Sequence, residues 1–290
     1  MEMRAYAKIN LYLDVMAKRS DGYHDILSLM QTVDLHDVVR LDVQEDAPGE
    51  IVLHCGAGLP CDEKNLAYRA ALAYFKGNIP CKLEINVQKN IPQQAGLAGG
   101  SADCAAVLRL LNQRFDRYSE SELLMLGAGL GADVPFCLAG GTVITRGIGE
   151  LMQPCAAMPD CYLVIARGGA GVSTPQAYRD LDAAYGDFAM QKKDSEARLA
   201  CVIDAMERGD VYAMCDAAYN IFESVVLPVH DVARALKHDM QENGAIGALM
   251  SGSGPSVVGI FDSEQLAQTV CRNINEKGIV AYVCKPVNQI

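Results

Sequence analysis

Between Pro92 and Asp103 the chain reads Pro-Gln-Gln-Ala-Gly-Leu-Ala-Gly-Gly-Ser-Ala-Asp, a run dense in glycine and alanine. An alternating apolar segment at residues 83–87 precedes this run. Apolar residues with helical spacing follow it, at Cys104, Val107, Leu108 and Leu111. Alternation is typical of a strand and the second spacing of a helix. The pattern therefore predicts a strand, a glycine-rich loop and the first turn of a helix.

Such a loop is suited to binding phosphate. The first turn of a helix leaves backbone N–H groups unpaired and carries partial positive charge, and glycine lets an anion approach the backbone. The run contains neither Gly-x-x-x-x-Gly-Lys-[Ser/Thr] nor Gly-x-Gly-x-x-Gly, so a Walker-type loop and a dinucleotide-binding Rossmann motif are both disfavoured. The alternative is a tight turn that binds no ligand.

Composition limits the class of protein. The chain has 290 residues, of which 50% are hydrophobic, and this length suits two domains better than one. The net charge of −11 argues against a nucleic-acid partner, which would require a basic face. The sequence shows no apolar run of about 18 residues and no apolar signal segment at its start, so we expect cytoplasmic residence and no membrane partner.

The eleven cysteines are interpreted as free thiols. Their number is odd, no Cys-x-x-Cys occurs, and most lie among apolar residues, which is typical of buried thiols in a reducing compartment. Cysteines expected to be buried in this way include Cys137, Cys161, Cys201 and Cys284. His54, Cys55 and Cys61 match no zinc-binding spacing.

Hydrophobic periodicity predicts a mixed α and β chain. Strands are expected at residues 9–15, 26–33, 38–43, 51–53, 83–87, 162–166, 247–250, 257–261 and 280–284, and a turn followed by a strand at 140–145. Helices are expected at 65–75, from a capping box at 119–122 through 130, from 174, at 195–208, 211–219, 232–243 and 264–276. A domain boundary is expected within 149–160. The β–β–α–β order after residue 247 resembles half of a ferredoxin-like sandwich.

Two charged residues occupy unusual places. Lys8 opens an apolar alternating strand, and Asp133 lies in the glycine-rich stretch Gly129-Leu-Gly-Ala-Asp-Val-Pro135. Taken alone, Lys8 is a solvated strand residue and Asp133 a turn former or a helix-terminus residue. Neither residue is diagnostic without the rest of the sequence.

Several motifs occur in one order along nearly the whole chain, from Ala5 to about Val283. They are Lys8-Ile-Asn10, Asp21-Gly-Tyr-His24, the glycine loop, Leu130-Gly-Ala-Asp-Val-Pro135, Gly147-x-Gly-Glu150 and Ser251-Gly-Ser-Gly-Pro-Ser256. This order resembles the GHMP kinase superfamily. The segment Arg19-x-Asp-Gly-Tyr-His24 further resembles the branch that phosphorylates the 2-hydroxyl of a cytidine diphosphate-linked methylerythritol, a precursor of isoprenoids.

The resemblance implies an α+β fold with two domains. Residues 1–153 would form an N-terminal ATP-binding domain like ribosomal protein S5. Residues 154–290 would form a C-terminal ferredoxin-like α/β sandwich, with the active site in the cleft between the two.

The resemblance also implies a catalytic pair and a nucleotide site. Asp133 would accept the proton of the substrate hydroxyl, and Lys8 would keep Asp133 ionised and stabilise the developing alkoxide. Asn65 would lie by the adenine of ATP, and Ser101 near the β- and γ-phosphates and Mg²⁺. The residues that would wrap the phosphates are Pro92, Gln93, Gln94, Ala95, Gly96, Leu97, Ala98, Gly99, Gly100, Ser101 and Ala102.

Four further residues match the substrate site of the family. Tyr23 would stack on cytosine and His24 would hydrogen-bond to its edge, while Asn10 and Thr174 would line the rest of the site. The alternative for Tyr23 and His24 is a simple turn with a half-buried aromatic ring.

The chain departs from the family pattern in the loop. Gln93 and Gln94 stand where small residues are expected, so their amides would narrow the loop mouth or reach the nucleotide. Ala98 replaces a common glycine and is tolerated where φ is negative. No second carboxylate is assigned to Mg²⁺.

Two other functions remain open at this point. One is a GHMP kinase for homoserine, mevalonate or a sugar. The other is a nucleotide sensor that retains the fold without catalysis, which Lys8 and Asp133 argue against because a sensor needs no base. The sequence does not indicate an oligomeric state.

Overall fold

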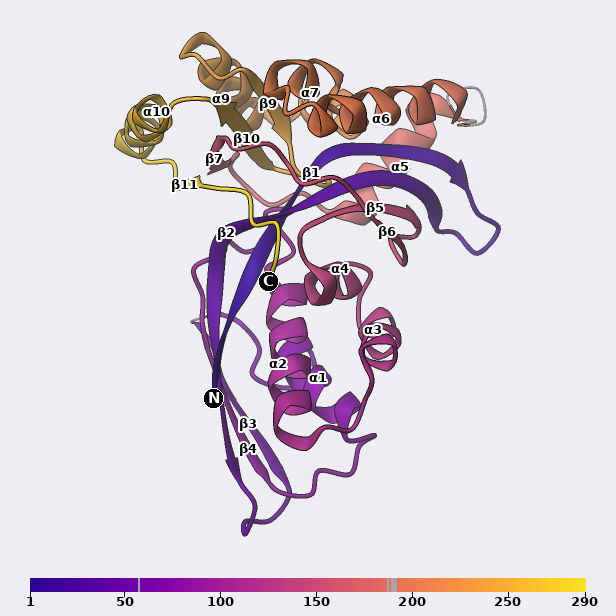
Figure 1. Ribbon diagram of the computed structural model, residues 1–290, viewed down its shortest axis with the longest axis vertical. Helices are drawn as coiled ribbons and strands as arrows, with labels where there is room; N and C mark the ends of the chain where they lie inside the picture. The colour runs from indigo at the N-terminus through magenta and orange to yellow at the C-terminus, as the bar shows by residue number, and fades with distance from the viewer. Residues whose placement is uncertain (57, 187, 189–191) are drawn as a thin grey trace. The chain divides into compact units, whose positions relative to one another are not determined.

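The computed structural model describes residues 1–56, 58–186, 188 and 192–290 (Figure 1). It divides the chain into two compact units. The first unit comprises residues 1–7, 35–92 and 98–139, and the second comprises 8–34, 93–97 and 140–290. Two long strands, β1 (Glu2–Lys18) and β2 (His24–Gln44), contribute residues to both units. The predicted domain boundary after residue 153 stays a prediction.

The first unit packs helices against a sheet. The later part of β2 pairs antiparallel with β4 (Lys82–Gln88), which pairs parallel with β3 (Glu50–His54). The helices are α1 (Leu66–Tyr74), α2 (Gly99–Phe115), α3 (Glu120–Ala128) and α4 (Val134–Ala139). Helix α2 contacts the other three, as Figure 1 shows. Its apolar residues 104–108 are all buried, so this helix forms the centre of the unit's core.

The second unit contains an antiparallel sheet in the order β11-β7-β10-β9. These strands are β7 (Tyr162–Arg167), β9 (Gly247–Met250), β10 (Ser256–Phe261) and β11 (Ala281–Cys284). Helices α9 (Asp231–Glu242) and α10 (Glu264–Glu276) share one apolar core with the sheet. This β-α-β-β-α-β arrangement is ferredoxin-like, as expected from the sequence.

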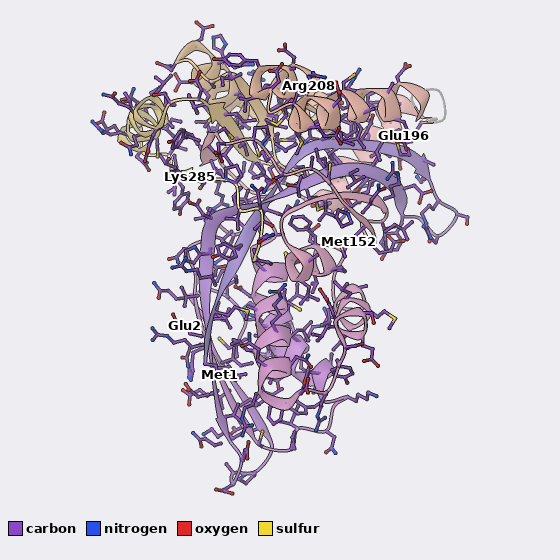
Figure 2. The ribbon with its side chains drawn as sticks, viewed as in Figure 1. Met1, Glu2, Met152, Glu196, Arg208 and Lys285 are labelled. Carbon is purple, nitrogen blue, oxygen red and sulfur yellow. The ribbon has the colours of Figure 1, made fainter. Side chains whose placement is uncertain are left out.

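The rest of the second unit surrounds the early part of β2. Strand β5 (Thr142–Gly147) pairs with β2 and with β6 (Leu151–Pro154), and β1 pairs parallel with the short β8 (Tyr219–Asn220). The helices here are α5 (Thr174–Tyr185), α6 (Lys192–Glu207), α7 (Val211–Ala217) and α8 (Glu223–Val226). Glu196 of α6, labelled in Figure 2, accepts a hydrogen bond of 3.1 Å from Arg146 of β5.

Three expectations about local structure were wrong or incomplete. Residues 24–44 form one strand rather than two, and two of the polar residues between the expected strands, Asp34 and Asp37, are hydrogen-bonded to other segments. Asp34 donates its backbone N–H to the carbonyl of Lys285, and the buried Asp37 carboxylate accepts two backbone N–H groups. Cys201 is exposed and Cys137 half-buried, since α6 turns Leu199 and Val202 inward instead of Cys201. The short elements α4, α8, β6 and β8 had no periodic signal.

Among the described residues, no helix has the length and apolar character needed to cross a membrane.

Candidate active site

The glycine-rich loop leads into the start of α2, as the sequence predicts. The N-cap is Ala98, whose methyl group cannot accept a hydrogen bond, and the first turn contains no acidic residue. The first backbone bond runs from the N–H of Ala102 to the carbonyl of Ala98, at 2.9 Å. The N–H groups of Gly99, Gly100 and Ser101 therefore lack a capping side chain at Ala98, and their partial positive charge is available to an anion.

The backbone of the loop is strained at two residues that are not glycine. Gln94 has φ of 51° and Ala98 has φ of 57°, both in the left-handed region. The condition under which Ala98 would fit, a negative φ, is thus not met, and a residue with a Cβ costs roughly 1–2 kcal/mol there. Gln94 packs near Gly171, where an added Cβ would lie 2.6 Å from Oε1 of Gln94. Strain of this kind is found at ligand-binding loops.

Within the second unit, the loop packs against the Ser251–Ser256 motif. The hydroxyl of Ser251 donates to the carbonyl of Gly96 at 3.1 Å. Gly96 has φ of 74°, and a Cβ on it would lie 2.3 Å from the carbonyl oxygen of Ser251, so only glycine fits there. Asn220, which sequence reasoning missed, holds this motif by donating to the carbonyls of Met250 and Gly252 at 2.6 and 2.8 Å.

Lys8 lies at this junction. Its backbone N–H donates to the carbonyl of Leu97 at 3.1 Å, and a Cβ on Gly252 would lie 3.4 Å from Nζ of Lys8. Lys8 is only 4% exposed, so the interpretation of it as a solvated strand residue is wrong. The second unit therefore brings a buried ammonium group close to the middle of the predicted phosphate loop.

A chain of buried hydrogen bonds orients Lys8. Nζ of Lys8 donates to Oδ1 of Asn10 at 2.8 Å, and Nδ2 of Asn10 donates to Oγ of Ser28 at 2.8 Å. The Ser28 hydroxyl in turn donates to the carbonyl of Tyr12 at 2.8 Å. Because that hydroxyl uses its proton on Tyr12, it can only accept from Asn10, and this fixes which side of the amide faces Lys8. Ser28 gave no sequence signal.

Asp133 immediately precedes α4 in the first unit. Its carbonyl accepts the N–H of Cys137 at 3.0 Å, so Asp133 does occupy a helix terminus. The adjoining turn lies near the start of α2, since a Cβ on Gly131 would lie 3.9 Å from Oγ of Ser101. A role at the helix start is compatible with a role in catalysis.

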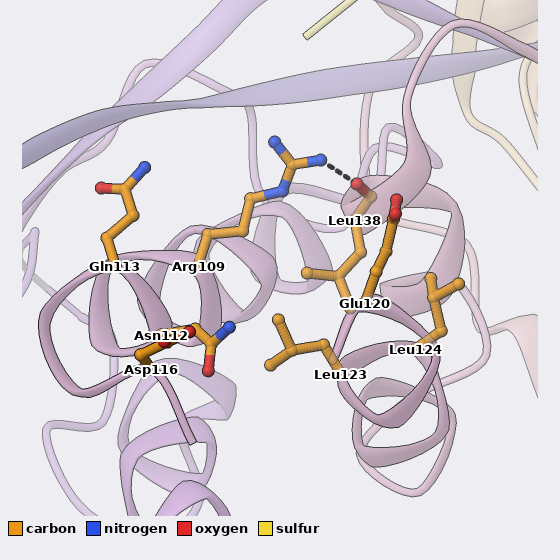
Figure 3. A pocket seen from close by; sticks show the side chains of 8 residues that line it. All are labelled: Arg109, Asn112, Gln113, Asp116, Glu120, Leu123, Leu124 and Leu138. Atoms are coloured by element: carbon orange, nitrogen blue, oxygen red, sulfur yellow. Dashed lines mark hydrogen bonds between the residues drawn. The ribbon is translucent and has the colours of Figure 1, made fainter. Parts of the chain in front are cut away.

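The other end of α4 is held by α2. Arg109 donates from its guanidinium to the carbonyl of Leu138, as Figure 3 shows. Burial lowers the pKa of Arg109 from its usual value. Arg109 lines a hollow of about 400 Å³ between α2 and α3 with Asn112, Gln113, Asp116, Glu120, Leu123, Leu124 and Leu138. None of these residues belongs to the predicted site, but the Arg109 contact holds α4, the helix that directly follows Asp133.

Asn65 is the N-cap of α1. Its Oδ1 accepts the backbone N–H of Ala67 at 2.9 Å, and its Nδ2 donates to the carbonyl of Pro60 at 2.9 Å. The side chain thus joins the loop after β3 to the start of α1.

Three charged residues that sequence reasoning missed support the same region. Lys89, at the end of β4, donates to Asp37 and to Asp103, the latter at 2.7 Å. Burial and the neighbouring Asp37 raise the pKa of Asp103 to about 7, against the opposing effect of Lys89. A Cβ on Gly99 would lie 3.3 Å from Nζ of Lys89, so this buried cluster stands directly beside the first turn of α2.

Tyr23 and His24 follow the turn between β1 and β2. The Tyr23 ring is 61% exposed, whereas His24 is buried and stacks on Tyr178 with ring centroids 4.6 Å apart. Nε2 of His24 lies 2.7 Å from Oδ1 of Asp182. Burial alone would raise the pKa of Asp182, but hydrogen bonds from Lys18 and His24 outweigh this and hold the pKa below its usual value. Asp182 and Tyr178 were not foreseen.

Thr174 begins α5, and its Oγ1 lies 2.8 Å from Oγ of Ser253. The second unit thus joins Thr174 to the Ser251–Ser256 motif that also contacts Gly96. Among the described residues, no group of three or more histidines, cysteines or carboxylates could hold a metal ion.

Comparison with known proteins identifies the family. The family model for the GHMP kinases N terminal domain matches residues 65–141, and that for the GHMP kinases C terminal matches residues 202–280. The chain belongs to the GHMP kinase family, and it is a small-molecule kinase.

Curated relatives indicate which branch of the GHMP kinase family this chain resembles. The chain is 41% identical over 277 residues to the 4-diphosphocytidyl-2-C-methyl-D-erythritol kinase of Alkaliphilus metalliredigens, covering 95% of this chain and 92% of that protein. It is 39% identical over 290 residues to the enzyme of the same name from Clostridium botulinum, covering 99% and 100%.

Solved structures agree in fold. A crystal structure of 4-(cytidine 5'-diphospho)-2C-methyl-D-erythritol kinase superposes with a TM-score of 0.81 at 29% identity, covering 99% of each chain. Homoserine kinase from Cytophaga hutchinsonii gives a TM-score of 0.73 at 22% identity, covering 99% and 95%. The homoserine kinase likeness supports the two-domain α+β fold alone.

Proposed function

We propose that this kinase transfers the γ-phosphoryl group of ATP to the 2-hydroxyl of 4-diphosphocytidyl-2-C-methyl-D-erythritol. The observation that carries the proposal is the similarity to curated kinases of that name over nearly the full length of both chains. The Arg19–His24 segment, whose sequence resembles this branch of the family, also presents an exposed aromatic side chain, Tyr23, on which a base would stack. Cytoplasmic residence and the lack of a nucleic-acid partner belong to the same proposal.

The start of α2 is suited to binding the phosphates of a nucleoside triphosphate. It offers backbone N–H donors at Gly99, Gly100 and Ser101 with no acidic residue in the turn, which is the donor set that phosphate prefers. Bound ATP would supply the phosphoryl group, and Mg²⁺ would neutralise charge on it. The Ser101 hydroxyl is the proposed protein contact.

The catalytic groups would be Asp133 and Lys8. Asp133 would accept the proton of the attacking hydroxyl. Lys8, held by Asn10, would place its positive charge near the reacting oxygen. Phosphoryl transfer depends mainly on positioning and charge neutralisation, so the oriented ammonium contributes more than the strength of the base.

The cytosine site would use the side chains of both Tyr23 and His24. Because Asp182 can only accept a hydrogen bond, a neutral His24 carries its proton on Nε2 and leaves Nδ1 as an acceptor. The exocyclic amino group of cytosine is a donor, so Nδ1 of His24 is the matching group. The exposed ring of Tyr23 would stack on the base.

The direct test is ADP release with three alcohols under the same conditions. We expect turnover with the cytidylyl substrate and none above background with homoserine or mevalonate. Turnover with either of the latter at a comparable kcat/KM would contradict the proposed substrate, and lack of turnover with all three would favour a nucleotide sensor.

Replacing Tyr23 by Ala is expected to raise the KM for the cytidylyl substrate by about 10-fold or more, because stacking on an aromatic ring contributes about 1–3 kcal/mol. The KM for ATP should change less than about twofold. Tyr212→Ala is the matched control, since that ring is 59% exposed. Equal changes in both KM values would contradict the pocket assignment.

Replacing Ser28 by Ala is expected to lower kcat by about 10-fold and to leave the KM for ATP unchanged. The change leaves Nδ2 of Asn10 without the Ser28 acceptor and lets the amide turn a donor toward Lys8; a buried polar group left unpaired costs about 1–3 kcal/mol. Ser28→Thr keeps the hydroxyl and should restore kcat. In an Asn10→Ala background Ser28→Ala should have little further effect on kcat, and a full additive loss would show that Ser28 acts otherwise.

A further inference from the structure

Two cysteines in the loop between β3 and α1 face each other. The Sγ atoms of Cys55 and Cys61 are 3.1 Å apart. Cys61 is exposed and Cys55 is half-buried. Five residues lie between them in sequence, so the pair closes a short loop within the first unit. A thiol pair at this separation needs to approach by about 1 Å to reach the 2.05 Å of a disulfide bond.

The pair is connected to the start of α1. Nδ2 of Asn65 lies 3.7 Å from Sγ of Cys55 and donates to the carbonyl of Pro60, the residue before Cys61. The same Asn65 side chain caps α1 through the N–H of Ala67. A change at the two sulfurs therefore alters the contacts of a helix-capping residue.

The two thiols differ in a way that assigns their roles. Cys61 is accessible to a reagent in solution, whereas burial, and next the hydrogen bond with Cys61, raise the pKa of Cys55 to about 11. A thiolate is the attacking species in thiol–disulfide exchange. Cys61 is thus the thiol that a reagent meets first, and Cys55 is the neighbour that completes the exchange.

We propose that Cys55 and Cys61 form a reversible dithiol–disulfide site whose oxidant is a small-molecule disulfide, and that its oxidation weakens ATP binding. The Cys61 thiolate attacks one sulfur of the reagent, breaking its S–S bond and releasing one thiolate. Cys55 loses its proton and attacks Sγ of Cys61, releasing the second. Both released groups take up the two thiol protons, so the protein loses two electrons and two hydrogens and the reagent becomes two thiols. An excess of thiol reverses both steps.

The effect on ATP rests on the proposed function, because it depends on Asn65 lying beside the adenine. Closing the disulfide draws the sulfurs together, removes the thiol proton that Cys55 donates to the carbonyl of Pro60, and moves the sulfur that accepts from Nδ2 of Asn65. The helix cap and the loop at Pro60 must adjust to this change. We expect the Kd for ATP to increase about threefold or more in the oxidised protein.

The site itself is tested without an activity measurement. The native full-length protein is treated with oxidised glutathione, and peptide mass mapping should find a Cys55–Cys61 cross-link, two mass units below the dithiol, which dithiothreitol reverses. Cys61→Ser should abolish the cross-link. Cys201→Ser, which removes another exposed thiol, should leave it intact.

Each other result has a definite meaning. A stable glutathione adduct on Cys61 without the cross-link, or no modification of Cys55 and Cys61, overturns the dithiol site. A cross-link that leaves the Kd for ATP unchanged overturns the link to nucleotide binding. If the reduced protein binds ATP but phosphorylates no alcohol, the proposed function fails while the dithiol site stands, so the two failures are distinguishable.

Discussion

Replacing Asp133 by Asn is expected to lower kcat by about 10²-fold or more while the Kd for ATP stays within about threefold of its original value. An amide cannot accept the proton of the attacking hydroxyl, and general base catalysis contributes about 10²–10⁴-fold. Asn is as good as Asp at the start of a helix, so α4 should be retained. The loss should therefore appear in turnover and leave binding intact.

Asp46→Asn is the matched control. Asp46 is an exposed residue in a turn of the same unit, and its substitution should leave kcat unchanged. Steady-state ADP release measures kcat, and equilibrium binding measures the Kd for ATP. A kcat for Asp133→Asn within about threefold of the original would remove Asp133 from the proposed mechanism, and equal losses for both variants would point to a general effect of charge.

The sequence predicted the strand, the glycine-rich loop and the helix that follows it well, because the signal there is local. Glycines, a preceding strand and a following helical spacing all occur within a few tens of residues, and the structure places α2 directly after them. The ferredoxin-like sheet was predictable for the same reason, since each of its strands has its own apolar alternation.

Residues that act through distant partners gave no such signal. Ser28 matters because it touches Asn10, and Asn220 because it holds carbonyls 30 and 32 residues later in the chain. Polar side chains of this kind have no periodicity, and their partners are known only after folding. The positive φ of Ala98 was missed because composition does not report a backbone angle for a residue other than glycine.

Lys89 is the clearest example of a residue whose role the sequence does not reveal, because nothing in the sequence distinguishes it from an exposed surface lysine. In the structure its side chain is 12% exposed and contacts Asp37 and Asp103, whose side chains are 0% and 8% exposed. Burial alone would lower the pKa of Lys89, but the two carboxylates outweigh it and raise the pKa. The cation is therefore retained only because both acids surround it.

Replacing Lys89 by Met is expected to lower the free energy of unfolding by about 3–5 kcal/mol, because it leaves buried carboxylates without their counter-ion. Urea denaturation at pH 7 without ligand measures this loss. Lys82→Met is the matched control, since its ammonium lies 3.9 Å from the exposed Glu50. An exposed pair contributes about 0–1 kcal/mol. Comparable small losses in both variants would show that the Lys89 cluster does not stabilise the fold.

The pH dependence gives an independent check. The pKa of Asp103 is raised to about 7 in the folded protein from a usual value of 3.8, so the folded state binds more protons than the unfolded state between these values. Stability from this group therefore increases as the pH falls from 7 toward 4. Without Lys89 the carboxylate of Asp103 should take up a proton still more readily, so the deficit of Lys89→Met should shrink over the same range. A deficit that is constant or grows on acidification would mean that Lys89 stabilises the first unit by packing of its methylene groups rather than by its charge.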